Sequence, residues 1–149
     1  MDEVELTQYI TTSLAGVDVV EKDGDRYFFY DPGEQAPPDR RFPFATLVTG
    51  DRHDQFSQLD RTGIYRLNIG VSKETFRSLL GPEPFSPPAA GTVSSEYDFT
   101  AIDRWLPHPV YGSMYWVSVL NPGAATLEMM KSLLAEAYEM SSRRQGKTT

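Results

Sequence analysis

Residues 64–80 read IYRLNIGVSKETFRSLL, and this stretch predicts a strand that leads directly into a helix. Residues 64–69 alternate between apolar and polar types, which is the period of a half-buried strand. One face would carry the apolar side chains Tyr65, Leu67 and Ile69. Arg66 and Asn68 would lie together on the opposite face, so the strand presents a polar pair there.

The second half of the stretch predicts a short helix over residues 73–80. Ser72 suits the N-cap position, where its hydroxyl can accept a backbone N–H. The buried side of the helix would consist of Phe76, Leu79 and Leu80. Gly81 and Pro82 should end it, because glycine readily leaves helical geometry and proline lacks the N–H that a helix needs.

Upstream, the sequence predicts a helix, a hairpin and a further strand. The helix spans about residues 2–15, and the two strands of the hairpin lie near 17–20 and 26–30. The dipeptide Asp-Gly at 23–24 suits the turn between them, since glycine takes a positive φ without a Cβ clash. A third strand is expected at residues 44–49.

Downstream, the sequence predicts a last strand at residues 115–120 and a long final helix at about 126–143, with Thr126 as its N-cap residue. The apolar stripe of that helix would consist of Leu127, Met130, Leu134, Ala137 and Tyr138. Residues 96–106 mix aromatic and charged types and fit either a strand or a helical turn.

These elements predict one α+β domain over residues 1–149. Strands joined by short turns favour antiparallel pairing, and helices at both ends favour a two-layer sandwich. We therefore expect an antiparallel sheet of about five strands with the N- and C-terminal helices on one face. Residues 31–39 and 81–96 are rich in proline and glycine and should be loops, and the chain from about residue 144 should be a disordered tail.

Four stretches carry a resemblance to a known family: IYRLNIGVSKETF (64–76), FPFATLVT (42–49), YDFTAIDRWLPHPVYG (97–112) and WVSVLNP (116–122). From about residue 18 to residue 138 the chain resembles a bacterial family of uncharacterised domains, which is similar in architecture to the MmcQ/YjbR-like group. The resemblance implies a YjbR-like or frataxin-like α+β sandwich. It brings no accepted catalytic residues, and the DNA-binding label of some members of the wider group rests on analogy.

Composition excludes several classes of function. The chain has 149 residues, no cysteine and a formal net charge of −7. Without cysteine there are no disulfides, zinc–thiolate sites, iron–sulfur clusters or thiol catalysis. The acidic surface would repel nucleic acid, although Arg40 and Arg41 form a local basic pair. The acidic start MDEVELTQYI and the lack of a long apolar run predict a cytoplasmic protein with no membrane contact.

The first candidate site is the polar loop that holds Asp51, His53, Asp54, Asp60 and Arg61. It could bind a small ligand, or a divalent metal through His53 with Asp51 or Asp54. The alternative is a solvated loop with local Asp–Arg pairs and turns, and we favour it because the ligand spacing is unspecific. We therefore predict no metal site.

The second candidate is His108, which lies between two prolines and close to Tyr111. Imidazole titrates near neutrality, so His108 could act as a general acid or base, with Asp98 or Asp103 orienting it. The favoured alternative is a rigid loop in which the histidine hydrogen-bonds the main chain.

The third candidate is the pair Arg66 and Asn68 on one strand face. Arg66 could clamp a carboxylate or phosphate, and Asn68 could bind an amide or hydroxyl. Alternatively, Arg66 is a buried structural residue paired with Asp60 or Asp98. The sequence favours neither reading.

Together these observations predict a non-enzymatic binding or interaction module for an unidentified small molecule or protein. The candidate ligand-binding residues are Arg66, Asn68, Asp60, Arg61 and Tyr111. The competing hypothesis is a small hydrolase or isomerase with a histidine–aspartate pair, for which the candidates are His108, His53 and Asp98. No dinucleotide-binding, Walker or nucleophile-elbow pattern is present, so we expect no cofactor. The protein should be a monomer or homodimer.

Overall fold

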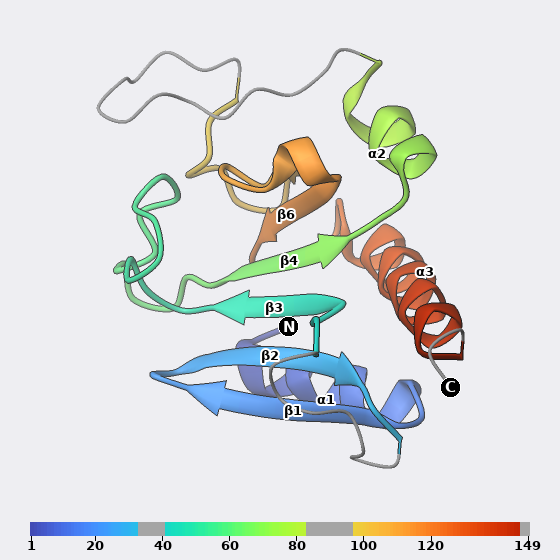
Figure 1. The fold of residues 1–149 in the computed structure, drawn as a ribbon. Coiled ribbons are helices and arrows are strands. Elements are labelled where there is room, and N and C mark those ends of the chain that lie inside the picture. Colours follow the sequence, from blue (N-terminus) through green and yellow to red (C-terminus); the bar gives the residue numbers. More distant parts are fainter. Residues whose placement is uncertain (33–40, 83–96, 147–149) are drawn as a thin grey trace.

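The computed structural model describes residues 1–32, 41–82 and 97–146, and Figure 1 shows how the elements are arranged. In chain order they are α1 (Glu3–Ser13), β1 (Val17–Lys22), β2 (Asp25–Tyr30), β3 (Ala45–Val48), β4 (Arg66–Gly70), α2 (Lys73–Leu80), β5 (Leu106–Pro107), the 3-10 helix η2 (Gly112–Met114), β6 (Trp116–Leu120) and α3 (Leu127–Gly146). The predicted loops at 31–39 and 81–96 and the end of the predicted tail lie largely outside the described residues.

The strands form one sheet in the order β1-β2-β3-β4-β6-β5, and every pair of neighbours is antiparallel. The predicted α+β fold is therefore confirmed. β5 is the strand beyond the five expected, and it comes from the segment that fitted either a strand or a turn. Leu106 and Pro107 of β5 pair with Ser118 and Val117 of β6.

α1 and α3 cover one face of the sheet. Leu6 and Ile10 of α1 and Met130 and Leu134 of α3 are almost completely buried. They belong to one apolar cluster with the sheet residues Phe28, Leu47, Leu67, Ile69, Val117 and Val119. Because all of these sheet residues point to one side, both helices pack on the same face, as predicted. Within the described ranges, no helix has the length and apolar character of a membrane span.

The opposite face of the sheet is covered by loops. Val48, Leu106 and Leu120 pack there with Leu59 and Phe99, which come from two loop segments on either side of β4 in the sequence. β4 also lies between two other strands, so its first four residues are all buried. A polar group removed from water must find a partner inside the protein, and this applies to both polar side chains of β4.

The N-terminal ends of α2 and α3 are capped in different ways. Ser72 Oγ accepts the N–H of Thr75 at 3.1 Å, as predicted for α2. At α3, however, Thr126 donates its hydroxyl to Asp103 at 2.6 Å. The same carboxylate accepts the N–H groups of Gly123, Ala125 and Thr126. Thr126 therefore stands at the N-cap position of α3, where its C=O accepts the N–H of Met130, but its hydroxyl donates to an acceptor from a distant part of the chain.

Candidate functional site

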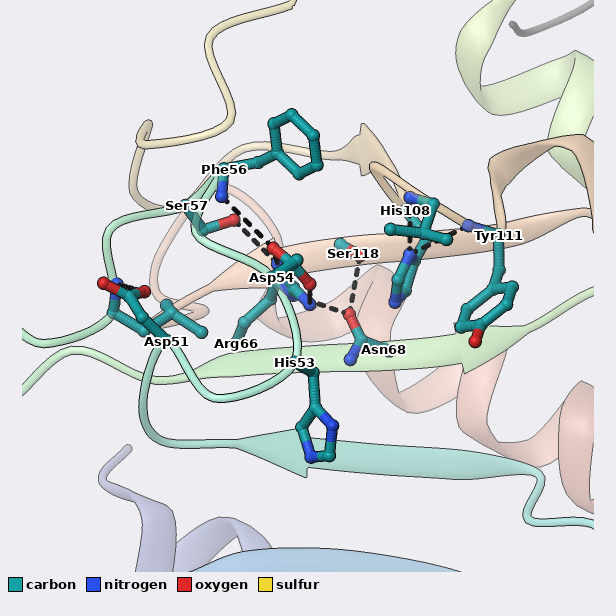
Figure 2. Close-up of polar contacts among 12 residues, drawn as sticks. Asp51, His53, Asp54, Phe56, Ser57, Arg66, Asn68, His108, Tyr111 and Ser118 are labelled. Carbon is teal, nitrogen blue, oxygen red and sulfur yellow. Dashed lines mark hydrogen bonds and ion pairs between the residues drawn. The ribbon is translucent and has the colours of Figure 1, made fainter. Parts of the chain in front are cut away.

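Arg66 is buried at the start of β4 and is hydrogen-bonded on several sides (Figure 2). Its Nη1 and Nη2 donate to the two carboxylate oxygens of Asp54 at 3.0 and 2.7 Å. Nη1 also donates to Ser57 Oγ at 2.9 Å, and Nε donates to Asn68 Oδ1 at 3.0 Å. Four N–H groups of the guanidinium therefore donate to protein atoms, which leaves about one without a named acceptor. Arg66 cross-links β4 to the loop of residues 51–64.

The partner of Arg66 is neither of the two aspartates named from the sequence. Asp60 accepts the N–H of Asp51, and Asp98 accepts the hydroxyl of Thr100. Burial raises the pKa of the Asp54 carboxyl, but the hydrogen bonds and charge of Arg66 outweigh burial and leave this pKa below its ordinary value. The pair is thus a buried structural ion pair.

Asn68 continues the network across three neighbouring strands. Its Nδ2 donates to Thr46 Oγ1 of β3 at 3.0 Å, and its Oδ1 accepts from Ser118 Oγ of β6 at 2.7 Å. Both residues lie directly opposite Asn68 in the sheet register. The side chain of Asn68 is buried, so it serves the sheet and does not face a ligand.

His108 is buried next to this network, and its Nδ1 accepts the N–H groups of Val110 and Tyr111, both at 3.0 Å. Burial, followed by the charge of Arg66, lowers the pKa of His108 to about 3, with Asp54 opposing the shift. A neutral ring that accepts at Nδ1 carries its proton on Nε2 and has no free basic nitrogen. His108 therefore stabilises its own loop through hydrogen bonds to the main chain, which is the alternative favoured from the sequence.

The other residues proposed around His108 have separate tasks. Asp103 caps α3 and Asp98 accepts from Thr100, so neither orients the imidazole. Tyr111 is 53% exposed and its ring lies 4.9 Å from the imidazole, centroid to centroid. Figure 2 shows Tyr111 beside His108.

The loop of residues 51–61 is held together by its own polar groups. Asp51 accepts the N–H of Leu59 at 2.7 Å. Arg61 donates to the carbonyl oxygens of Ser57, Gln58 and Thr100. The described part of the chain contains no group of three acidic or histidine side chains placed to hold a metal ion. The loop is thus held by hydrogen bonds to its main chain and by the buried pair of Asp54 with Arg66, and not by Asp–Arg pairs within the loop.

His53 points away from this loop toward β2 and meets a carboxylate that the sequence did not suggest. Its Nε2 lies 3.1 Å from Oδ2 of the buried Asp25 and 3.2 Å from the hydroxyl of Tyr27. The other oxygen of Asp25 accepts from Thr49 and Arg52, which fixes the carboxylate. The imidazole side chain is 55% exposed, so one histidine–aspartate pair does lie at the surface.

A groove lies at the end of the sheet where β3 begins, β4 ends and β6 begins. It encloses about 560 Å³ and is lined by residues 42–44, 70–73 and 114–116 and by α3 residues between 137 and 144. Two large apolar side chains on this lining stay exposed: Phe42 at 68% and Met114 at 66%. Exposed apolar side chains around a hollow are typical of binding surfaces.

The groove carries positive charge, whereas the chain as a whole has a negative net charge. Among the described residues its lining includes Lys73 and Arg144 but no aspartate or glutamate, although the chain has 21 acidic and 14 basic residues. Both cations are exposed, and neither forms an ion pair with any residue that the structure describes. The groove is therefore a cationic region on an acidic protein.

Gly70 gives the groove its aromatic floor. It lies opposite Trp116 in the register of β4 and β6. A Cβ atom at Gly70 would lie 3.1 Å from two atoms of the indole, closer than nearly all real contacts. The missing side chain therefore lets Trp116 lie against the backbone of β4, where it lines the groove.

A family model described as "Family of unknown function (DUF6194)" matches residues 1–149. The chain belongs to this family. No curated protein and no solved structure matches the chain. The only chemistry that bears on the function of this DUF6194 domain is therefore that of its own residues.

Sequence reasoning did not identify the groove or Asp25 in this DUF6194 domain. Each wall segment of the groove is short, and the segments are far apart in the chain, so no local pattern marks them. Lys73 was visible only as a helix residue, and Arg144 was assigned to the predicted tail, whereas α3 continues to Gly146. The usable signal was Gly70, a glycine at the end of a strand, which often marks a close approach of another group.

Proposed function

We propose that this DUF6194 domain is a non-enzymatic binding module and that its site is the groove at the end of the sheet. The supporting observation is the hollow of about 560 Å³ with exposed Phe42 and Met114 on its lining. That volume lies within the roughly 300–1,000 Å³ of small-molecule sites. Among the described residues the lining offers aromatic, aliphatic and cationic side chains but no histidine, aspartate or glutamate, so binding fits it better than catalysis.

The proposed site differs from the surface predicted from the sequence. Arg66, Asn68 and His108 have partners inside the protein, whereas the groove lining includes the exposed side chains Phe42, Lys73, Met114 and Arg144. The groove begins two residues beyond Asn68, at Gly70, so the buried network supports the strand that forms one wall. The network thus has a positioning role in this proposal.

Trp116 provides a direct test of binding. The chain has two tryptophans, so Trp105→Phe leaves Trp116 as the single reporter. Titration with the neutral apolar dye Nile red should quench Trp116 in this variant, with energy transfer to the bound dye. Trp116→Phe serves as the matched control, and the quenching by the dye should be lost in this variant. An unchanged Trp116 spectrum at saturating dye would contradict the groove as a binding site.

A second candidate function rests on the contact between His53 and Asp25, and it is hydrolysis of small activated esters. A carboxylate oxygen can only accept, so Nε2 is the donor in this contact, and in the neutral form of the ring the lone pair lies on Nδ1. Nδ1 could take a proton from water while the water oxygen attacks the ester carbonyl, and the imidazolium could then protonate the leaving group.

Hydrolysis of p-nitrophenyl acetate tests this second candidate. The wild-type protein should react faster than free imidazole at equal concentration, and His53→Gln and Asp25→Asn should each remove the excess. His108→Asn is the matched control, because that imidazole is buried and its Nδ1 is occupied. A wild-type rate no higher than that of free imidazole would exclude the candidate.

Two broader features are also part of the proposal. A relationship to the MmcQ/YjbR-like group is supported by the α+β sheet with terminal helices. A cytoplasmic location is supported by the absence of cysteine from the sequence. Neither nucleic acid nor a membrane is a proposed partner. Arg41, one residue of the local basic pair, forms an ion pair with Asp18 at 2.6 Å, and Arg40 lies outside the described residues.

A further inference from the structure

We infer that the ligand of the groove is a soluble amphipathic carboxylate, with an apolar body and one anionic head group. The inference rests on the proposed function and names the class of molecule that the groove would accept. It starts from Lys73 and Arg144, two cations without an ion pair among the described residues, beside an apolar and aromatic lining.

The groove differs from the rest of the chain in the sign of its charge. The chain carries a net charge of −7, so a random stretch of its surface would repel an anion. The groove is an exception, since its described lining combines two basic residues with no acidic one. A guanidinium matches a carboxylate in shape and can bond both of its oxygens, and an ammonium adds a second point charge.

The apolar part of the ligand follows from the remaining lining. Trp116 lies close to Gly70, and Phe42 and Met114 leave large apolar areas in contact with water. Methionine adapts its shape to different apolar groups. An apolar body would remove these areas from water, which an inorganic anion or a sugar phosphate could not do.

The test compares three ligands with the same ten-carbon chain: decanoate, decanol and decyltrimethylammonium, all below the concentration at which they form micelles. Binding is followed by Trp116 fluorescence in the Trp105→Phe background. Decanoate should bind about tenfold tighter than decanol, the size expected for two partly exposed ion pairs, and the cation should bind most weakly. Added salt should weaken the binding of decanoate alone.

Matched variants separate the groove cations from charge in general. Lys73→Gln with Arg144→Gln should remove the advantage of decanoate over decanol. Lys131→Gln with Arg143→Gln changes the net charge equally, but these residues pair with Glu128 and Glu139 away from the groove, so the advantage should remain. Circular dichroism verifies that all variants are folded.

The outcomes distinguish the two proposals. Equal affinities for decanoate and decanol, or an equal loss in both double variants, would overturn the carboxylate inference and leave the binding module standing. If vesicles of phosphatidylserine change the Trp116 signal and monomeric decanoate does not, a membrane surface is the partner and the inference is also wrong. If neither Nile red nor any ten-carbon ligand changes the signal, the proposed function fails as well.

Discussion

Arg66 and Arg144 carry the same guanidinium group in two different settings. Arg66 is 1% exposed and donates four hydrogen bonds to protein oxygens. Arg144 is exposed, lines the groove and has no ion pair with the described residues. The comparison shows that an arginine is available to a ligand only if the fold leaves its donors unused. For this reason the groove, and not the buried network, is the proposed site.

The largest effect is expected from Arg66→Met, which tests whether the buried arginine stabilises the fold. This change leaves Asp54 buried without its partner and should lower the free energy of unfolding by about 3–5 kcal/mol. Urea denaturation at pH 7 measures it. Arg143→Gln is the control, since an exposed arginine should shift stability by no more than about 0.5 kcal/mol.

The double variant Arg66→Met, Asp54→Leu sharpens this result. It removes both charges together and should recover part of the loss, because no uncompensated charge stays buried. If Arg66→Met alone costs less than about 1 kcal/mol, well below the cost of breaking a buried pair, the network is not a structural cross-link.

A smaller effect is expected on the acid side of the stability profile, from His108. Its pKa is about 3 in the folded state and near 6.5 when unfolded, so below pH 6.5 only the unfolded state takes up the proton. The free energy of unfolding should therefore fall by about 2–3 kcal/mol between pH 6.5 and 4.5, and above pH 6.5 His108 should have no effect.

His108→Asn provides the comparison for the acid profile. Asparagine can still accept main-chain N–H groups near the position of Nδ1 but does not titrate. Urea midpoints measured at half-unit steps should show a much flatter acid limb in this variant than in the wild type. Parallel limbs would mean that His108 is protonated in the folded protein, contrary to its burial beside Arg66.

Asp103 is intermediate between the two arginines, because it is half-exposed and yet accepts four donors at the start of α3. Asp103→Asn keeps a residue that tolerates its φ of 56° but loses the charge at the helix end. The variant should unfold about 1 kcal/mol more easily than the wild type in urea. Thr126→Val removes one donor and should lower the free energy of unfolding by less than Asp103→Asn does. A larger loss in Thr126→Val would indicate that Thr126, and not Asp103, stabilises the start of α3.

The smallest effect is expected from the groove cations. Lys73→Gln and Arg144→Gln should each change the free energy of unfolding by less than about 0.5 kcal/mol, because neither side chain forms an ion pair within the described chain. Thermal and urea unfolding both measure this. A loss above about 1 kcal/mol would assign these residues to the stability of α2 or α3 and weaken their role in ligand binding.

The sequence predicted the strand at 64–69 and the helix at 73–80 well, because local periodicity and capping decide them. Leu67 and Ile69 face the helices, and Arg66 and Asn68 face the other way, as expected from their alternation. The sequence did not decide between a strand and a helical turn near β5, since a strand of two residues carries almost no pattern of its own. Its position depends on β6, which gives it a partner.

The candidate site was harder to predict than the fold. His108 and Arg66 were identified as chemically interesting, but their roles depend on which loop covers them. Asp25 stands between the predicted turn at 23–24 and the predicted strand at 26–30, and only the fold brings it to His53. Spatial proximity between residues 28 positions apart leaves no trace in the spacing of a single sequence.

By itself, the sequence determined the helices, most of the strands, the antiparallel hairpin and the two faces of β4. These features follow from the local period of apolar side chains and from turn and cap residues. Only the tertiary structure decided which polar groups are enclosed and which stay exposed, since burial depends on segments far along the chain. The physical reason is that a donor buried away from water must be paired internally, whereas an exposed one remains free for a ligand.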